Sequence, residues 1–383
     1  MAPSLNAVIN FDRSQFANGG PREDAFLPAT VPVAQHPGDP AARDAPQGPA
    51  LHLPGTRFPG SGSGGYSAGE GEGAPAVLWT HCTSGFFASA APSAHRALWY
   101  ANAVPFTLAQ AGCAVVGPDY AGLGVSELWD GSVTRHECLV SSASARDALN
   151  VLRATRWAFA GLLAPRFVTI GYSQGRGVAW SVVEALDSDE FADLRAGYVG
   201  TIAASPMTDA LSGVPEFILP WVGRMLDSIL PGFKLSQWLT PLEVARTELL
   251  REVQGDIAAS QQLYFTGETI LREDYRNIWY VNAYAKLADA GRKPFRGPLL
   301  VVQGTENMYI PYDITTATHL PTLHTTRQTW LQWIKDRFEG RLLAKSGCVR
   351  SEPESFLPVE QYQTTGKPFP QWAGAPEYST TYR

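Results

Sequence analysis

Five short apolar runs, each ending in turn residues, constrain the fold of this chain more than any other feature. Such runs are typical of buried parallel strands. They cover residues 76–81, 113–120, 166–173, 198–206 and 298–304. Between the first four runs, helix-like stretches carry apolar residues at spacings of three and four. This alternation predicts right-handed β-α-β units and a mostly parallel, doubly wound sheet of the α/β class.

The sequence between the fourth and fifth runs is too long for a simple connection. Its amphipathic helical patterns are broken by Pro and Gly, which predicts an inserted helical cap at residues 210–292. The core would then comprise residues 76–209 and 293–340. The Gly-, Ser- and Pro-rich residues 1–75 are expected to be extended and partly disordered. We expect the aromatic tail, residues 341–383, to pack on the core.

Composition limits the classes of partner. The chain has 383 residues and a formal net charge of -6, so it has no basic surface for nucleic acid, and a small-molecule partner is favoured. No stretch reaches the ~18 apolar residues of a membrane-spanning helix, and no signal-peptide pattern is visible, so we expect a cytoplasmic protein. The sequence does not indicate an oligomeric state. The four cysteines lack the spacing of a metal site. They are expected as free, buried thiols, with no metal or cofactor bound.

One motif points to catalytic chemistry. Ser173 lies in a Gly-x-Ser-x-Gly pattern that follows an apolar run and precedes a helical pattern, the context of a nucleophile on a sharp strand-to-helix turn. Gly171 and Gly175 are small where strand and helix would otherwise collide. The backbone N–H of Gln174 would lie at the helix N-terminus, where it can stabilise an oxyanion.

A second oxyanion donor is expected from the loop after the first apolar run. The candidates are the backbone amides of Cys82 and Thr83 in the segment T-H-C-T-S-G. The neighbouring His81 is expected to be a packed residue at the end of the strand rather than a reactive one. Asp119 ends another run at the same sheet edge, and we expect it to fix the turn by hydrogen bonding.

Several segments together resemble the secretory-lipase family of α/β-hydrolases, which includes the Candida lipase A type. They are W-T-H-C-T-S-G, A-P-S, G-P-D-Y-A-G-L-G, G-Y-S-Q-G, P-L-L-V-V-Q-G-T and W-L-Q-W-I-K-D-R-F, in family order over residues 76–340. The resemblance implies a lipase- or esterase-like serine hydrolase with a cap over an apolar acyl pocket. It implies a Ser, Asp, His triad in that chain order, with Ser173 as nucleophile and the Gln174 amide as oxyanion donor.

The chain departs from the family pattern at three positions. Cys82 and Arg176 each occupy a position at which the family usually has glycine. The charge of Arg176 opposes the dipole at the start of its helix. The third departure concerns the triad acid, because Asn307 occupies the position of the family's aspartate. An asparagine cannot stabilise an imidazolium by charge. Glu306 is adjacent and could replace the acid, and Asp313 is the other nearby carboxylate.

The catalytic histidine of the family lies after a further helix and strand. His319 matches it best by position, with His324 as the alternative. From Asn307 to His319 there are 319 − 307 = 12 positions, whereas a helix, a strand and two connections need at least ~20. The sequence therefore predicts loss of the last core strand, through a deletion or an incorrectly joined coding sequence. The histidine would then approach Ser173 from a loop or from the start of the final helix.

Three functional hypotheses follow. The first is a serine hydrolase that cleaves an ester or related acyl compound through an acyl-Ser173 intermediate, with His319 as the base and Glu306 or Asn307 orienting it. The second is a hydrolase-fold protein that has lost catalysis and serves as a binding component, for example in a biosynthetic pathway. The third keeps the acylation step but transfers the acyl group to an alcohol or an amine.

Overall fold

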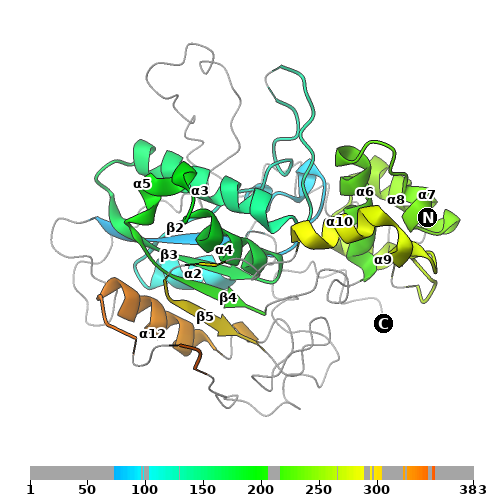
Figure 1. The fold of residues 1–383 in the computed structure, drawn as a ribbon. Coiled ribbons are helices and arrows are strands. Elements are labelled where there is room, and N and C mark those ends of the chain that lie inside the picture. The colour runs from blue at the N-terminus through cyan, green and yellow to red at the C-terminus, as the bar shows by residue number, and fades with distance from the viewer. Residues whose placement is uncertain are drawn as a thin grey trace, which may run out of the picture.

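The protein is built around one parallel β-sheet, as a computed structural model shows (Figure 1). The structure describes residues 73–95, 98, 103–128, 130–205, 216–264, 266–288, 294–295, 297–303, 322–323, 326–343 and 347–349. The sheet has five strands in the order β2-β1-β3-β4-β5. They are β1 (Ala74–Thr80), β2 (Ala114–Val116), β3 (Leu163–Tyr172), β4 (Tyr198–Ala204) and β5 (Leu299–Val302). All four strand pairs are parallel, which confirms the predicted sheet.

The second strand is shorter than its apolar run predicts. It ends at Val116, whereas the run continues to Tyr120. Pro118 has no backbone N–H and cannot continue a ladder of hydrogen bonds. Gly117 also approaches β1 closely, because a Cβ there would lie 2.7 Å from the Trp79 ring. Residues 117–120 therefore follow β2 outside the strand, and Tyr120 reaches the carbonyl of His81, just after β1.

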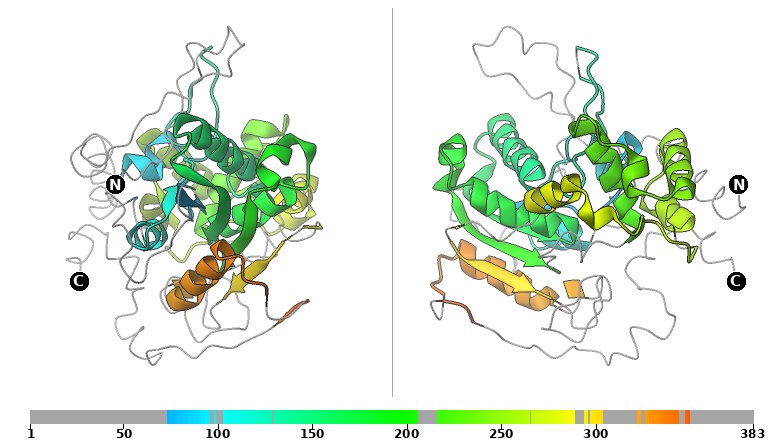
Figure 2. Two further views of the ribbon diagram at one scale, coloured as in Figure 1. Left: turned by 90° about the vertical axis from the view of Figure 1, so that its left-hand side faces the viewer. Right: turned by 45° about the vertical axis from the view of Figure 1, so that its right-hand side comes forward.

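Helices cover both faces of the sheet (Figures 1 and 2). On one face, α3 (Ser141–Ala158) and α4 (Gln174–Ala185) pack on β1 and β3 in a buried apolar cluster that includes Leu78, Leu149 and Phe167. On the other face, α2 (Ala103–Gln110) and α12 (Arg327–Phe338) pack in a second cluster. Successive strand residues point to opposite faces, so alternate residues of β1 belong to the two clusters, and a continuous apolar run serves both.

The segment between β4 and β5 folds into helices around a third apolar cluster. Its elements are η6 (Glu216–Ile218), α6 (Leu219–Ile229), α7 (Leu235–Trp238), α8 (Pro241–Val253), α9 (Ile257–Tyr264), η7 (Tyr275–Asn277) and α10 (Trp279–Ala288). Figure 1 shows these helices grouped on the side to which the arrowheads of β4 and β5 point. Trp221 and Trp238 are fully buried at the centre of the cluster. The helical insertion thus has its own core, and residues 210–292 remain the predicted boundaries of a cap.

The loop after β1 contributes to all three apolar clusters. Cys82 packs in the cluster of α2 and α12, Phe86 and Phe87 pack with the helical insertion, and Ala90 and Ala91 pack with α3. The short 3₁₀ helices η2 (Ala88–Ala90) and η3 (Pro92–Ala94) shape its second half. The loop residues 82–91 therefore connect the sheet, its covering helices and the insertion.

Several sequence predictions fall on residues that the structure leaves undescribed. They are the strand-loss segment at 304–321, residues 1–72, and most of the tail after residue 340. Beyond residue 321, the described part of the chain contains α12 and no strand. All four cysteines are free thiols, as expected. Three are buried, but Cys348 is exposed, so the prediction of burial is wrong for that residue, which lies beyond the last helix of the core.

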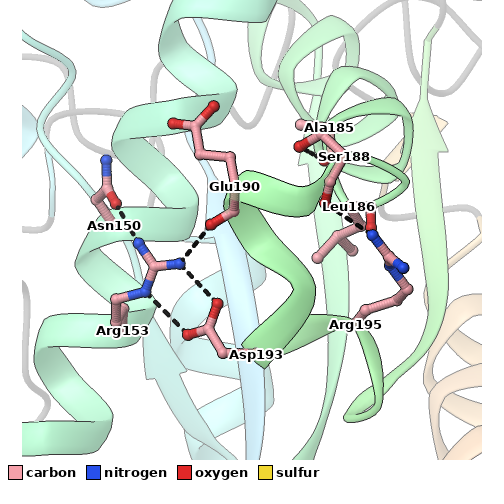
Figure 3. Close-up of polar contacts among 8 residues, drawn as sticks. All are labelled: Asn150, Arg153, Ala185, Leu186, Ser188, Glu190, Asp193 and Arg195. Atoms are coloured by element: carbon pink, nitrogen blue, oxygen red, sulfur yellow. Dashed lines mark hydrogen bonds and ion pairs between the residues drawn. The ribbon is translucent and has the colours of Figure 1, made fainter.

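Two arginines hold α3 and α4 to the connection before β4, which contains η5 (Asp189–Phe191) and α5 (Ala192–Arg195) (Figure 3). Arg153 of α3 donates two hydrogen bonds to the carboxylate of Asp193, at 2.9 and 2.6 Å. Arg195 donates to the carbonyls of Leu186, Asp187 and Ser188 at 2.7, 3.1 and 2.7 Å. These carbonyls follow the end of α4, where a helix lacks partners and a positive charge is favoured.

Replacing Arg195 should show how much its hydrogen bonds at the C-terminal end of α4 stabilise the fold. We expect Arg195→Met to lower the free energy of unfolding by about 1–3 kcal/mol, since hydrogen bonds from a charged donor to three carbonyls are lost. Urea denaturation would measure the change. The matched control is Arg146→Met, because Arg146 pairs with Glu190 at 3.2 Å in an exposed position, where ion pairs contribute less than about 1 kcal/mol. Equal effects of the two substitutions would show that α4 is not anchored in this way.

Candidate functional site

Ser173 lies at the turn between β3 and α4 in a backbone conformation that L-residues rarely adopt. Its φ and ψ are 56° and −120°. Such a conformation costs on the order of 1–3 kcal/mol and persists only where surrounding structure enforces it. The Ser173 N–H donates to the carbonyl of Ala204, at 3.1 Å, which ties the turn to the end of β4. The sharp strand-to-helix turn predicted from the Gly-x-Ser-x-Gly motif is therefore present.

The two glycines of the motif allow β1 to contact this turn. A Cβ at Gly175 would lie 2.0 Å from the carbonyl oxygen of Thr80, and a Cβ at Gly171 would lie 2.1 Å from the carbonyl oxygen of Gly175. Real Cβ atoms do not come this close to backbone oxygens. The buried Thr80 hydroxyl donates to the Gly175 carbonyl, at 2.6 Å. Strand β1, the serine and the first turn of α4 therefore form one tightly packed unit.

Gln174 is the first residue of α4 and is buried. The first N–H groups of a helix have no acceptor within the helix, so they are available to an anion at this end. The Gln174 side chain does not extend into solvent. Its Nε2 lies 3.2 Å from Nε2 of His136, a residue 38 positions away in the loop before α3.

The peptides that carry the other two candidate donors lie beside the first turn of α4. A Cβ at Gly175 would come within 2.4 Å of the His81 carbonyl oxygen, which belongs to the same peptide group as the Cys82 N–H. The Tyr120 hydroxyl donates to this carbonyl, at 2.9 Å. The next carbonyl, that of Cys82, accepts from Nδ1 of His81 at 2.7 Å. Cys82 and Thr83 are both buried.

Three aromatic rings connect these loops. The His81 ring stacks on Tyr120 with a centroid distance of 4.0 Å, and His136 lies on the Tyr120 ring at 5.8 Å, with only 7° between the planes. We call these three residues the ring stack. All three side chains are buried. Burial lowers the pKa of His81 to about 3 and that of His136 to about 4, and it raises the pKa of Tyr120. The stack is therefore uncharged at neutral pH.

Arg176, which departs from the family pattern, points away from solvent. Its Nη1 donates to the carbonyl of Ser205 at 2.6 Å, and its side chain is buried. Burial lowers the pKa of the guanidinium well below its usual range, but arginine keeps its charge in proteins. Ser205 has a positive φ of 57° at the end of β4. Arg176 thus connects the first turn of α4 to the strand end beside it, a position that glycine could not fill.

Asp119 lies at the end of the segment that follows β2. Its carboxylate accepts from the backbone N–H of Ser93, at 3.2 Å, and from the Ser93 hydroxyl. Burial raises its pKa to about 6, although both hydrogen bonds act in the opposite direction. Asp119 is therefore a hydrogen-bonding residue, as expected, but its bonds connect the segment after β2 to Ser93 of η3, 26 positions away, and do not fix its own turn.

The structure brings Ser173, Gln174, Cys82 and Thr83 to one edge of the sheet. The predicted acid positions Glu306 and Asn307 and the predicted base His319 lie outside the described residues, as do Asp313 and His324. Their roles stay predictions. Sequence reasoning missed His136, because no motif or spacing connects it to Gln174.

The described residues lack two other kinds of functional feature. In that part of the chain, no three His, Cys, Asp or Glu residues are grouped so that they could hold a metal ion. Within the same residues, each helix is too short or too polar to cross a bilayer.

The strain at Ser173 predicts a difference between two substitutions that both remove the hydroxyl. Glycine tolerates positive φ, whereas alanine does not. We therefore expect Ser173→Gly to be more stable than Ser173→Ala by about 1–2 kcal/mol in urea denaturation. Equal stabilities would mean that the backbone at this turn is unstrained.

The buried, neutral His81 predicts a loss of stability in acid. Its pKa is about 3 in the folded protein and 6.5 ordinarily, so the unfolded chain binds the proton first as the pH falls below 6.5. Each pH unit between these values costs the folded state about 1.4 kcal/mol. Between pH 7 and pH 5 the wild type should lose about 2 kcal/mol more stability than His81→Phe, as measured by urea denaturation at both pH values. Parallel losses would contradict a buried neutral His81.

Known structures share this architecture. No protein-family model matches the sequence, and no curated protein matches it. Among solved structures, Candida antarctica lipase A in its closed state matches with a TM-score of 0.54 and 13% identity, over 78% of this chain and 79% of that one. The rice cell wall degrading esterase LipA from Xanthomonas oryzae matches with a TM-score of 0.52 and 14% identity, over 81% and 80%. The chain therefore has the α/β-hydrolase fold of the lipase A-like enzymes.

Proposed function

We propose that the protein is a serine hydrolase of the lipase or esterase type that cleaves an ester or a related small acyl compound. The observation that carries the proposal is the backbone of Ser173, which is strained at the apex between β3 and α4. Strain of this kind is characteristic of nucleophiles exposed at the end of an α/β-hydrolase sheet. The two solved structures compared above are a lipase and an esterase, which supports the same class of reaction.

The reaction would proceed through an acyl-enzyme. The Ser173 hydroxyl oxygen attacks the substrate carbonyl carbon while His319 takes its proton, and a tetrahedral intermediate forms. The backbone N–H of Gln174, with that of Cys82 or Thr83, stabilises the negative oxygen. The intermediate collapses, the C–O bond to the leaving alcohol breaks, and His319 returns the proton to that alcohol. Water then attacks the acyl-Ser173 with His319 as base, which releases the acid and restores the serine.

The helical insertion would act as the cap over the acyl pocket. Ligands of open α/β sheets bind outside the carboxyl ends of the strands, and Figure 1 shows the insertion on that side. The insertion contacts the candidate oxyanion loop directly, since the Ile257 N–H donates to the Ser84 carbonyl, at 3.1 Å. We propose that a substrate binds beside Ser173, at the edge of the sheet on which the insertion lies.

The sequence at the acid position favours a second candidate. Asn307 stands where the family has its acid, and replacing a triad aspartate by asparagine can lower kcat by about 10⁴ in a serine protease. A binding component that has lost catalysis is therefore the alternative function. Acyl transfer to an alcohol or amine is a variant of the first proposal, because it uses the same acyl-Ser173.

Covalent labelling distinguishes these functions. We expect a fluorophosphonate probe to label the purified wild-type protein and to fail with Ser173→Ala, because only an activated serine attacks the phosphorus. Mass spectrometry of the labelled peptide would locate the adduct. Ser181→Ala is the matched control, since Ser181 is a buried serine of α4, the helix that follows Ser173. Labelling of this variant should equal that of the wild type.

Absence of labelling in the wild type, under conditions that label a control lipase, would contradict the hydrolase proposal and favour the binding component. A labelled serine with no hydrolysis of p-nitrophenyl butyrate, but with product formed from an added alcohol, would assign the transferase variant.

A further inference from the structure

The amide groups proposed to stabilise the oxyanion come from two separate segments. The ring stack contacts the Gln174 side chain and the carbonyl groups of the peptides that carry the Cys82 and Thr83 N–H groups. Gln174 belongs to α4, whereas Cys82 and Thr83 follow β1. An oxyanion site depends on donors that are already oriented before the reaction, because reorganisation during the reaction would cancel their benefit. The contacts of the ring stack explain how buried side chains outside the triad could fix both donors.

The hydrogen bonds of His136 define its protonation state. Its Nδ1 lies 3.3 Å from the Ala121 carbonyl oxygen, which can only accept, so this nitrogen carries a proton. Its Nε2 faces the amide nitrogen of Gln174, which can only donate, so Nε2 carries none. The neutral Nδ1–H form of the imidazole satisfies both neighbours at once. The side chain of Gln174 is thereby held in one orientation relative to its own backbone.

The position of His136 is itself tightly determined. A Cβ added at Gly122 would lie 2.2 Å from the backbone nitrogen of His136, so the two backbones are in close contact. Gly122 has a φ of +83°. The ring packs on Tyr120 and near Phe86. His136 therefore provides a rigid anchor for Gln174 rather than a mobile partner.

The second donor is oriented by the other two rings. In a trans peptide the C=O and N–H groups point in opposite directions. The Tyr120 hydroxyl holds the His81 carbonyl, which directs the Cys82 N–H to the opposite side. Nδ1 of His81 holds the Cys82 carbonyl, which directs the Thr83 N–H in the same way. Both candidate peptides are thus held through their carbonyl groups.

We infer that Tyr120 and His136 are positioning residues of the proposed hydrolase, which orient the Cys82 and Gln174 amides toward the oxyanion through the contacts of one buried ring stack. This inference rests on the proposed function. It goes beyond it by assigning transition-state stabilisation to residues that touch neither the substrate nor the reacting atoms. Loss of either contact should weaken binding of the transition state while leaving binding of the substrate nearly unchanged.

Two ring-conserving variants test the inference on p-nitrophenyl butyrate. His136→Phe keeps a ring on Tyr120 but removes the acceptor for Gln174, and Tyr120→Phe keeps the stack but removes the hydroxyl. Each should lower kcat by about 10-fold with KM changed less than about twofold, which is smaller than the 10²–10³ lost when an oxyanion donor is deleted. His136→Gln, which restores an acceptor near the position of Nε2, should recover most of the loss.

Two further variants separate positioning from general damage. Tyr198→Phe removes the hydroxyl of a half-buried tyrosine on β4, which donates to Thr201 at 3.0 Å, and its kcat should match that of the wild type. Gln174→Met keeps the proposed backbone donor but removes the partner of His136. If His136 acts through Gln174, the double variant His136→Phe/Gln174→Met should lose no more kcat than either single variant.

The outcomes are distinguishable. A wild type that neither hydrolyses the ester nor reacts with the fluorophosphonate would overturn the proposed function. An active wild type with unchanged kcat in His136→Phe and Tyr120→Phe would overturn the positioning role alone. Multiplied losses in the double variant, or no recovery in His136→Gln, would also overturn it. If urea denaturation shows that His136→Phe is unfolded, Gln174→Met and Tyr120→Phe test the inference instead, with the same expected fall in kcat.

Discussion

The contact between the end of β1 and the first turn of α4 determines the rest of this structure. The Thr80 carbonyl lies so close to Gly175 that no side chain fits between them, and the Thr80 hydroxyl bonds to the carbonyl of the same glycine. This contact brings the loop after β1 to the helix N-terminus and forces the residue between strand and helix into a strained conformation. The rare backbone of Ser173 and the proximity of His81 are both consequences of it.

The fold was predictable because its signals are local or strongly periodic. The apolar runs predict all five strands, and the Gly-x-Ser-x-Gly motif predicts the turn at Ser173, because only glycine permits that close approach. The helical insertion was predictable from its length and its amphipathic patterns. The end of β2 was less predictable, since the apolar run continues past Val116 although Pro118 cannot continue the ladder of hydrogen bonds.

The candidate site was predictable only where it depends on the motif. Ser173 and the Gln174 amide follow from the strand-to-helix turn. The contact between His136 and Gln174 depends on how the loop before α3 meets α4, across 38 residues of sequence, and no residue pattern encodes that meeting. His136 stands between Arg135 and Glu137, so nothing in the sequence marks it as a buried residue. The same holds for Tyr120, whose hydroxyl finds a backbone acceptor 39 positions away.

The loop after β1 connects the helical insertion to the sheet. Its residues between positions 82 and 91 supply buried side chains to both faces of the sheet and to the core of the helical insertion. Partial unfolding of the insertion would withdraw Phe86 and Phe87 from their cluster and disturb the peptides beside Ser173. The insertion and the sheet should therefore melt in one cooperative transition, although each has its own apolar core. In this architecture the residues nearest the proposed chemistry also join the two parts into a single folding unit.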